Sequence, residues 1–392
     1  MTTKNDKCNK EVKVLSQLEH IRLRTGMYVG LIGDDDGANY DDVIYRLMKG
    51  VIDNAVDEFL MGYGKRIEIS LNWDSGRCSI RDYGRGIPLK KVVDCVSGSY
   101  YGGGMRASDL LPLTVGMNGI GITVVNALSE VFFVRSVRDG EFSEATFERG
   151  QLETTNQGRL ENSCESNGTY VSFIPDSTIF KNYKFREDHI MHRLKLYAYL
   201  NSGLTIVFNG VRICSTNGLK DFIIEKMQFE NTNIPFHFRS PKLEFGFTHK
   251  SESADEYYSF VNGHPTTEGG THLNAFKDGL LKALIDFSGK NFEADGVEKG
   301  IIGAVAVRIS SPVFEGTLKK KLAMREIYSD LVETIKHESI ALFHKFPSET
   351  EKLIKFAERK VRERMGSDEA FRIEVEKLHR NHGISAVDRD VR

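Results

Sequence analysis

Residues 51–58 form the stretch that decides the fold, Val51-Ile52-Asp53-Asn54-Ala55-Val56-Asp57-Glu58. Apolar pairs recur every four residues around it, from Val43/Ile44 to Phe59/Leu60, and this pattern predicts an amphipathic helix over about 41–61. Positions 46, 50, 54 and 57 are four, four and three residues apart, so they share one face of the helix. An amide and a nearby carboxylate on that face offer the oxygen ligands that Mg²⁺ accepts while it keeps others for substrate phosphates. A solvated acidic face is the alternative interpretation of this stretch alone.

Two glycine-containing segments follow. Alternating residues over 66–71 and 78–81 predict a β-hairpin, which ends in Asp82-Tyr83-Gly84-Arg85-Gly86-Ile87-Pro88. A strand-end aspartate can accept a hydrogen bond from an exocyclic amine such as that of adenine, and glycines let a flat ring approach the backbone. The second segment, Gly116-Met117-Asn118-Gly119-Ile120-Gly121, leads into a predicted helix. Free N–H groups at such a junction favour an anion, usually phosphate. Each segment is weak alone, and neither a Rossmann fingerprint nor a P-loop is present.

The composition narrows the class of protein. The chain has 392 residues, 40% of them hydrophobic and 28% charged, which is enough for two domains of ordinary globular composition. A net charge of -2 excludes a polycation that coats nucleic acid, so any DNA contact must be local. Five scattered cysteines and the lack of a long apolar run predict a soluble intracellular protein with reduced thiols and no membrane contact. The strand and helix patterns predict an α+β sandwich over residues 1–225. A second, α/β unit is expected over 226–392, with a long, exposed, charged helix at its C-terminus.

The motifs are far more specific in combination. The order Asn54, Asp82-x-Gly84-x-Gly86, Gly116-x-x-Gly119-x-Gly121 and Gly168-Thr169 resembles the four nucleotide-binding motifs of the GHKL ATPases. That superfamily includes type II topoisomerases, MutL mismatch-repair proteins, heat-shock chaperones and sensor histidine kinases. Longer stretches are similar to the B subunits of gyrase and topoisomerase IV over nearly the whole chain: Leu18–Arg22, Gly26–Gly30, Val124–Ser129, Phe260–Asn262 and Glu268-Gly269-Gly270-Thr271-His272. The resemblance implies a GHKL (Bergerat) ATPase sandwich followed by a transducer domain, which is similar to ribosomal S5 domain 2.

The resemblance also implies roles for individual residues. Asn54 would coordinate Mg²⁺, and Asp82 would bind the adenine amino group, with Thr169 and Asp57 nearby in a water network. Lys319, in the loop 314–322, would sense the γ-phosphate and couple the two domains. The adenine pocket would be lined by Arg85, Gly86, Ile87, Pro88 and Arg138. The phosphates would lie against the backbone of Gly116, Met117, Asn118, Gly119, Ile120 and Gly121, at the end of a mobile lid over about 97–117.

The partners implied by the resemblance are those of a type II topoisomerase. ATP and Mg²⁺ are the expected cofactors, and ATP would drive dimerisation with a second copy of the chain into a clamp (N-gate) that captures and passes duplex DNA. The A subunit of a topoisomerase would bind through a C-terminal half that lies beyond this sequence. The expected location is the cytoplasm, in association with the nucleoid. Basic residues of the second unit are the candidate DNA contacts: Arg308, Lys336, Lys355, Arg359, Lys360, Arg362 and Arg364.

The sequence departs from the family at positions that matter for hydrolysis. Gly50 stands where relatives carry the glutamate that activates the attacking water, and losing such a base typically removes a factor of about 10²–10⁴ in rate. Helix propensity gives no reason for a glycine there, since it is about 1 kcal/mol worse than alanine. The triplet Thr317-Leu318-Lys319 keeps only the lysine of the family pattern. A hydrolysis-deficient paralogue or mutant that acts as a closed clamp and a MutL-like ATPase are therefore the alternatives. Gyrase and topoisomerase IV are not distinguished.

Overall fold

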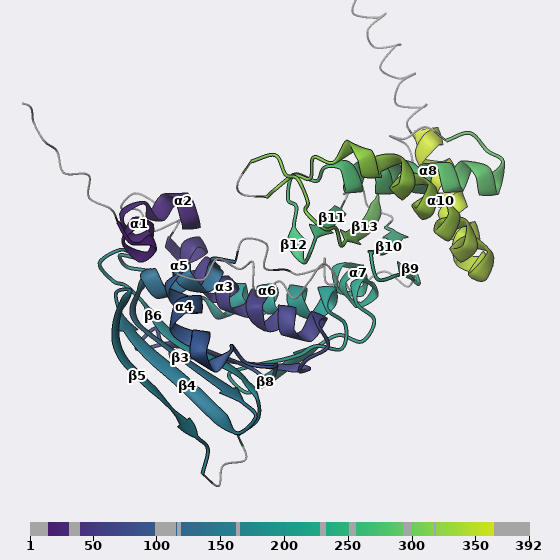
Figure 1. Ribbon diagram of the computed structural model, residues 1–392. Helices are drawn as coiled ribbons and strands as arrows, with labels where there is room; N and C mark the ends of the chain where they lie inside the picture. The colour runs from purple at the N-terminus through teal and green to yellow at the C-terminus, as the bar shows by residue number, and fades with distance from the viewer. Residues whose placement is uncertain are drawn as a thin grey trace, which may run out of the picture. The chain divides into compact units, whose positions relative to one another are not determined.

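The computed structural model describes residues 15–30, 40–98, 115, 119–161, 165–227, 233–250, 256–292, 300–316 and 319–363, with the backbone alone for 40–42. The chain divides into two compact units between Thr216 and Asn217, somewhat before the boundary expected from the sequence. Figure 1 shows the helices and strands of both units. None of the helices in these ranges is long and apolar enough to cross a membrane.

An eight-stranded sheet forms the base of the first unit. Its strands are ordered β5-β4-β3-β6-β2-β1-β7-β8, and every adjacent pair is antiparallel except β1 and β7. The predicted hairpin is confirmed as β1 and β2, with Ile69 opposite Ile80. The strand bounds are β1 (Arg66–Leu71), β2 (Cys78–Asp82), β3 (Ser129–Arg138), β4 (Glu141–Glu148), β5 (Gln151–Arg159), β6 (Gly168–Pro175), β7 (Thr205–Phe208) and β8 (Val211–Cys214).

Helices cover one face of this sheet (Figure 1). The predicted amphipathic helix is confirmed as α3 (Tyr40–Leu60), and its apolar pairs from Val43 to Val56 are almost completely buried. This burial explains why the segment forms a long helix, because its apolar stripe packs into the core. The other helices are α1 (Gln17–Leu23), α2 (Thr25–Val29), η1 (Leu89–Lys91), α4 (Val92–Ser97), α5 (Gly121–Ala127) and α6 (Glu187–Leu200).

The second unit is built around a mixed five-stranded sheet with the order β12-β11-β13-β10-β9, in which β11 and β13 run parallel. Phe276 of α8 packs on Phe245 and Phe247 of β10, whereas Phe222 of α7 packs on Tyr258 and Phe260 of β11. Side chains alternate along a strand, so α7 and α8 cover opposite faces. The bounds are α7 (Leu219–Met227), β9 (Phe236–Arg239), β10 (Leu243–His249), β11 (Glu256–Val261), β12 (His264–Pro265), α8 (Thr271–Ser288), β13 (Ile301–Val307), η2 (Arg325–Ile327) and α10 (Tyr328–Lys345).

The charged C-terminal stretch is helical, as expected, but in two segments. Helix α10 ends at Lys345 with Phe346 as its C-cap, and the chain is helical again over residues 347–363. Pro347 accounts for the break, because proline lacks the N–H that would continue the first helix and is well suited to start the next. The second segment buries Leu353, Phe356 and Ala357 in the core of the unit, so it is not exposed on all sides.

Candidate functional site

Asp82 occupies the last position of β2, and its carboxylate is 7% exposed. Its Oδ1 accepts hydrogen bonds from the backbone N–H of Gly84 (2.9 Å) and of Thr169 (3.2 Å). Burial raises the pKa of Asp82 to about 6, against the opposing effect of these two N–H donors. Within the described ranges both donors reach Oδ1, so Oδ2 is available to accept a hydrogen bond from a ligand. The side chain is thus a buried, pre-oriented acceptor beside Thr169.

Glycines next to Asp82 permit close backbone packing. Gly86 has a φ of +78°, and a Cβ there would lie 2.6 Å from the carbonyl oxygen of Val137. Gly168 has a φ of +139°, and its Cβ would lie 2.2 Å from the carbonyl oxygen of Asp82. Any other residue would push the strand ends apart, because atoms cannot approach so closely. Two motifs that are distant in the sequence are therefore brought together by the β2–β6 pairing.

Arg85, in the loop that follows Asp82, is held by a residue that sequence reasoning did not assign to it. Its backbone N–H and guanidinium donate to the carboxylate of Glu58 on α3, at 2.8–3.1 Å, and the guanidinium lies over the ring of Tyr63 at 4.5 Å. Arg138 reaches the carbonyl oxygen of Gly86 at 3.4 Å. These contacts pin the loop 84–88 between α3 and β3.

The Ile87 carbonyl in the same loop accepts a hydrogen bond from the buried hydroxyl of Ser136 on β3, at 2.7 Å. Ile87 itself is buried, whereas Pro88 is exposed and precedes η1. The five residues predicted to line an adenine pocket thus lie together, and Ser136 joins them as a further anchor of the loop.

The polar stripe of α3 carries one exposed amide among carboxylates that already have partners. Asn54 is exposed. Asp57 is buried, and its Oδ1 accepts the backbone N–H of Val115 at 2.5 Å. Asp53 accepts from Lys49 and from the hydroxyl of Tyr197, each at 2.5 Å. The side chain of Asn54 has no hydrogen-bond partner among the residues that the structure describes, so its oxygen could be offered to Mg²⁺, which binds proteins through few side chains and keeps the rest of its ligands for phosphate and water.

Gly50 lies where α3 meets α5. A Cβ at this position would lie 3.1 Å from the carbonyl oxygen of Gly121 and 3.2 Å from Cγ2 of Val125. Helix propensity opposes a glycine at this position, whereas the close approach of the two helix backbones favours one, so the two effects act in opposite directions. Arg46, one turn earlier, donates to the carbonyl oxygen of Val29.

Helix α5 starts at Gly121, with Ile120 as its N-cap, and Gly119 is exposed with a φ of +64°. Three residues of the predicted phosphate segment, Gly116, Met117 and Asn118, lie outside the described residues.

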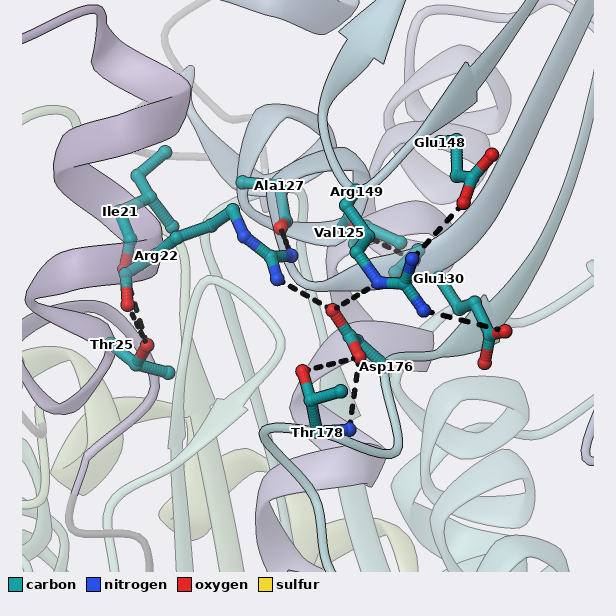
Figure 2. A network of polar contacts seen from close by, with 11 residues as sticks. Ile21, Arg22, Thr25, Val125, Ala127, Glu130, Glu148, Arg149, Asp176 and Thr178 are labelled. Atoms are coloured by element: carbon teal, nitrogen blue, oxygen red, sulfur yellow. Dashed lines mark hydrogen bonds and ion pairs between the residues drawn. The ribbon is translucent and has the colours of Figure 1, made fainter.

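The opposite end of α5 is anchored by a network that sequence reasoning missed, shown in Figure 2. Arg22 of α1 donates to the carbonyl oxygen of Ala127 (2.7 Å) and to Oδ2 of Asp176 (2.6 Å). The carboxylate of Asp176 is completely buried, and it also accepts the backbone N–H and hydroxyl of Thr178 and lies 3.5 Å from Arg149. Burial alone would raise the pKa of Asp176, but hydrogen bonds from Thr178 and Arg22 lower it below its ordinary value. A cation at the C-terminal carbonyl of α5 also complements the helix dipole.

Lys319 lies in the second unit and has a φ of +57°, a conformation that residues other than glycine rarely adopt. Its backbone N–H points to the carbonyl oxygen of Gly316 at 3.5 Å. The two residues before it, Thr317 and Leu318, fall outside the described ranges.

Four of the seven basic side chains proposed to contact DNA have local carboxylate partners, and Arg362 donates instead to the carbonyl oxygen of Glu358 at 3.4 Å. Lys336 pairs with Asp286 (2.5 Å) and Lys355 with Glu351 (2.6 Å), while Arg359 and Lys360 both reach Glu363. Burial lowers the pKa of Arg308. Arg364 lies outside the described residues. Any phosphate contact of the paired cations has to compete with these ion pairs.

Comparisons with known proteins agree with this geometry. The family described as histidine kinase-, DNA gyrase B- and HSP90-like ATPases matches residues 39–178, and the family described as DNA gyrase B matches residues 213–372. The B subunit of DNA topoisomerase 4 from Borreliella burgdorferi is 42% identical over 326 residues, 83% of this chain and 53% of the relative. The B subunit of Helicobacter pylori DNA gyrase is 32% identical over 82% of this chain and 44% of the relative. The chain thus spans about half the length of these relatives.

Solved structures give the same result. The 43K ATPase domain of Thermus thermophilus gyrase B, solved with an aminocoumarin, has a TM-score of 0.71 and 28% identity, covering 92% of this chain and 98% of that one. The B subunit of Myxococcus xanthus DNA gyrase has a TM-score of 0.71 at 21% identity, a likeness of fold alone. Both halves of the chain and the order of its motifs lead to one assignment: the chain belongs to the B subunits of the type II DNA topoisomerases, gyrase and topoisomerase IV, and corresponds to their GHKL ATPase and transducer region.

Proposed function

We propose that this chain is the ATP-operated clamp of a type II DNA topoisomerase, in which ATP binding joins two copies around duplex DNA. Asp82 carries the proposal: it is a buried carboxylate with a raised pKa, and one of its oxygens has no donor within the described ranges, a costly arrangement unless a ligand donates to it. The exocyclic amine of adenine is such a donor. Arg85, Gly86, Ile87, Pro88 and Arg138 would surround the base.

The triphosphate would extend from Asp82 toward the junction of α3 and α5. Mg²⁺ bound there with Asn54 would neutralise part of the phosphate charge. The backbone N–H groups at 119–121, together with Gly116, Met117 and Asn118, would hold the phosphate oxygens, and Lys319 of the second unit would contact the γ-phosphate. Duplex DNA and the A subunit of a topoisomerase would be the further partners, at the nucleoid.

We further propose that this chain binds ATP and hydrolyses it slowly, and therefore acts as a persistently closed clamp. Gly50 offers no base for the attacking water. The carboxylates on the neighbouring turns have other partners, because Asp53 accepts from Lys49 and Tyr197 and Asp57 accepts from Val115. A carboxylate already neutralised by an ammonium or engaged by strong donors is a poor proton acceptor.

The experiment is calorimetric titration of the chain with a non-hydrolysable ATP analogue. Asp82→Asn keeps the shape of the side chain but places an amide where an acceptor is needed. The mismatch should weaken binding by about 2–3 kcal/mol, roughly a hundredfold. Glu153→Gln on the exposed strand β5 is the matched control and should leave affinity unchanged. Undiminished affinity of the Asp82→Asn variant would show that Asp82 does not read the base.

A further inference from the structure

The segment Glu268-Gly269-Gly270-Thr271-His272 has no part in the nucleotide chemistry proposed above. In the structure it runs alongside residues 320–322, which directly follow Lys319. The contacts are the backbone hydrogen bonds from Glu268 N–H to Lys320 O (3.0 Å), from Leu322 N–H to Gly269 O (3.2 Å) and from Thr271 N–H to Leu322 O (3.1 Å). They form a short ladder that fixes the backbone on the C-terminal side of Lys319.

Gly270 makes this ladder possible. Its φ is +121°, and a Cβ there would lie 2.4 Å from the carbonyl oxygen and 2.5 Å from the backbone nitrogen of Leu322. Only a glycine allows two backbones to come so close. The Glu268 carboxylate adds an ion pair to Lys320 at 3.6 Å. We call residues 319–322 the lysine loop. Residues 266–272, to which this loop is hydrogen-bonded, we call the docking turn.

Buried polar side chains, linked by hydrogen bonds, connect the docking turn to β11. His272 is completely buried, and its Nε2 lies 3.1 Å from the hydroxyl of Thr266, which lies 2.6 Å from the hydroxyl of Ser259 on β11. When Ser259 donates its single proton to the carbonyl oxygen of Thr266 (3.0 Å), Thr266 donates to Ser259 and accepts from Nε2–H of His272.

This assignment leaves Nδ1 of His272 as an acceptor, and Nδ1 has no hydrogen-bond partner among the described residues. Burial lowers the pKa of His272 to about 4, so the ring is neutral near pH 7. A buried polar atom without a partner is costly, and a hydrophobic residue of similar size would avoid the cost. The histidine therefore contributes something that packing alone does not, namely the hydrogen bond that orients Thr266.

We propose that His272 is a positioning residue for Lys319: its hydrogen bond to Thr266 fixes the docking turn, which holds the lysine loop in the conformation that meets the γ-phosphate. This inference rests on the proposed function, in which Lys319 makes that contact. The positive φ of Lys319 supports it, because a lysine keeps this unfavourable conformation only where its surroundings impose it.

The test compares the affinity for a non-hydrolysable ATP analogue with the affinity for ADP, by calorimetry on the whole chain. The ratio measures the contribution of the γ-phosphate, and Lys319→Ala should lower it by about tenfold or more, the loss of a charge-assisted hydrogen bond. Thr266→Val and His272→Asn should lower the ratio toward the Lys319→Ala value and leave ADP affinity unchanged. His272→Gln, whose amide nitrogen reaches the position of Nε2, should restore it.

Combined variants separate a positioning role from a structural one. In the Lys319→Ala background, Thr266→Val should change the ratio no further. His249→Gln is the matched control, since His249 is also buried in this unit but packs on Phe356, and its replacement should lower the melting temperature without changing the ratio.

The proposal is overturned if Lys319→Ala lowers the ratio while Thr266→Val and His272→Asn do not, or if their effects persist without the lysine. Thr266→Val keeps the shape of the side chain, so it remains informative should His272→Asn fail to fold. If Lys319→Ala itself leaves the ratio unchanged, the γ-phosphate contact of the proposed function is wrong, and the role of His272 falls with it.

Discussion

Replacing Gly50 by glutamate should restore hydrolysis of ATP. The new carboxylate would project from α3 one turn before Asn54, on the same face, beside the proposed triphosphate. Asp53 and Asp57 on the neighbouring turns have other partners. A general base typically accelerates such a step by about 10²–10⁴, equivalent to roughly 3–5 kcal/mol of activation free energy. Phosphate release at saturating ATP should therefore rise by at least about a hundredfold.

The effect on stability follows from two opposing terms. Removing glycine from a helix interior gains about 1 kcal/mol. The added Cβ must displace the Gly121 carbonyl and Val125, at 3.1 and 3.2 Å, and overpacking of this kind costs about 1–3 kcal/mol. Gly50→Ala should thus leave the free energy of unfolding unchanged or lower it by up to about 2 kcal/mol. Helix propensity alone predicts a higher melting temperature for the alanine variant, but we expect no such rise because of the contact with α5.

Steady-state phosphate release is compared for the chain as given and for the alanine, glutamine and glutamate variants at position 50. Alanine reports the steric effect alone, and glutamine reports the shape of the side chain without its charge. Only the glutamate variant should accelerate turnover. The reasoning is refuted if the chain as given turns over as fast as the glutamate variant, or if glutamine performs as well as glutamate.

Three further predictions concern Asp82, Asp176 and the basic residues of the second unit. Affinity for an ATP analogue, measured by calorimetry, should fall by up to about tenfold per pH unit as the pH drops through about 6, because Asp82 loses an acceptor when it is protonated. The affinity of the Asp82→Asn variant should not change with pH, and a pH-independent affinity of the unmodified chain would contradict the role of Asp82. Asp176→Asn should lower the free energy of unfolding, measured in urea melts, by about 1–3 kcal/mol. This is less than the loss expected for a fully buried ion pair, because Arg22 is partly exposed to solvent. The effects of Asp176→Asn and Arg22→Ala should be less than additive, and strict additivity would argue against their coupling. Binding of duplex DNA to the ATP-closed dimer should weaken steeply with salt, and Lys336→Ala should reduce the logarithmic slope by about 0.9 if that lysine contacts a phosphate; a slope near zero would exclude phosphate contacts.

The sequence predicted the parts of the fold whose signal is local. The period of α3 and the alternation of β1 and β2 are visible within a few residues, and both elements were confirmed. Strand β5 gave no such signal, because all nine residues of Gln151–Arg159 are exposed and no face of the strand is apolar. Glycine-containing motifs indicated the strand ends around Asp82 for a related reason, since close backbone approach limits the residue type to glycine.

Contacts between distant segments were beyond the same reasoning. Arg22 and Asp176 are 154 positions apart, and Glu58 and Arg85 are 27 apart. A charged residue in a sequence has many potential partners, and only the register of β2, β3 and β6 under α3 and α5 selects one of them. The meeting of Gly50 with Gly121 is of the same kind: spacing along α3 shows which face position 50 occupies, but not that another backbone lies against it.

That meeting bears on the proposal that position 50 has lost a general base. If glutamate had simply been lost, any small residue would serve at position 50, and alanine would be the more stable choice in a helix by about 1 kcal/mol. The close approach of α5 makes glycine the residue with the least steric cost, so α5 can rest on α3 at the point where the phosphates are proposed to bind. The Gly50→Ala variant decides between the two accounts. A less stable alanine variant means that the helix contact maintains the glycine, whereas a more stable one means that the loss of the base left no structural trace.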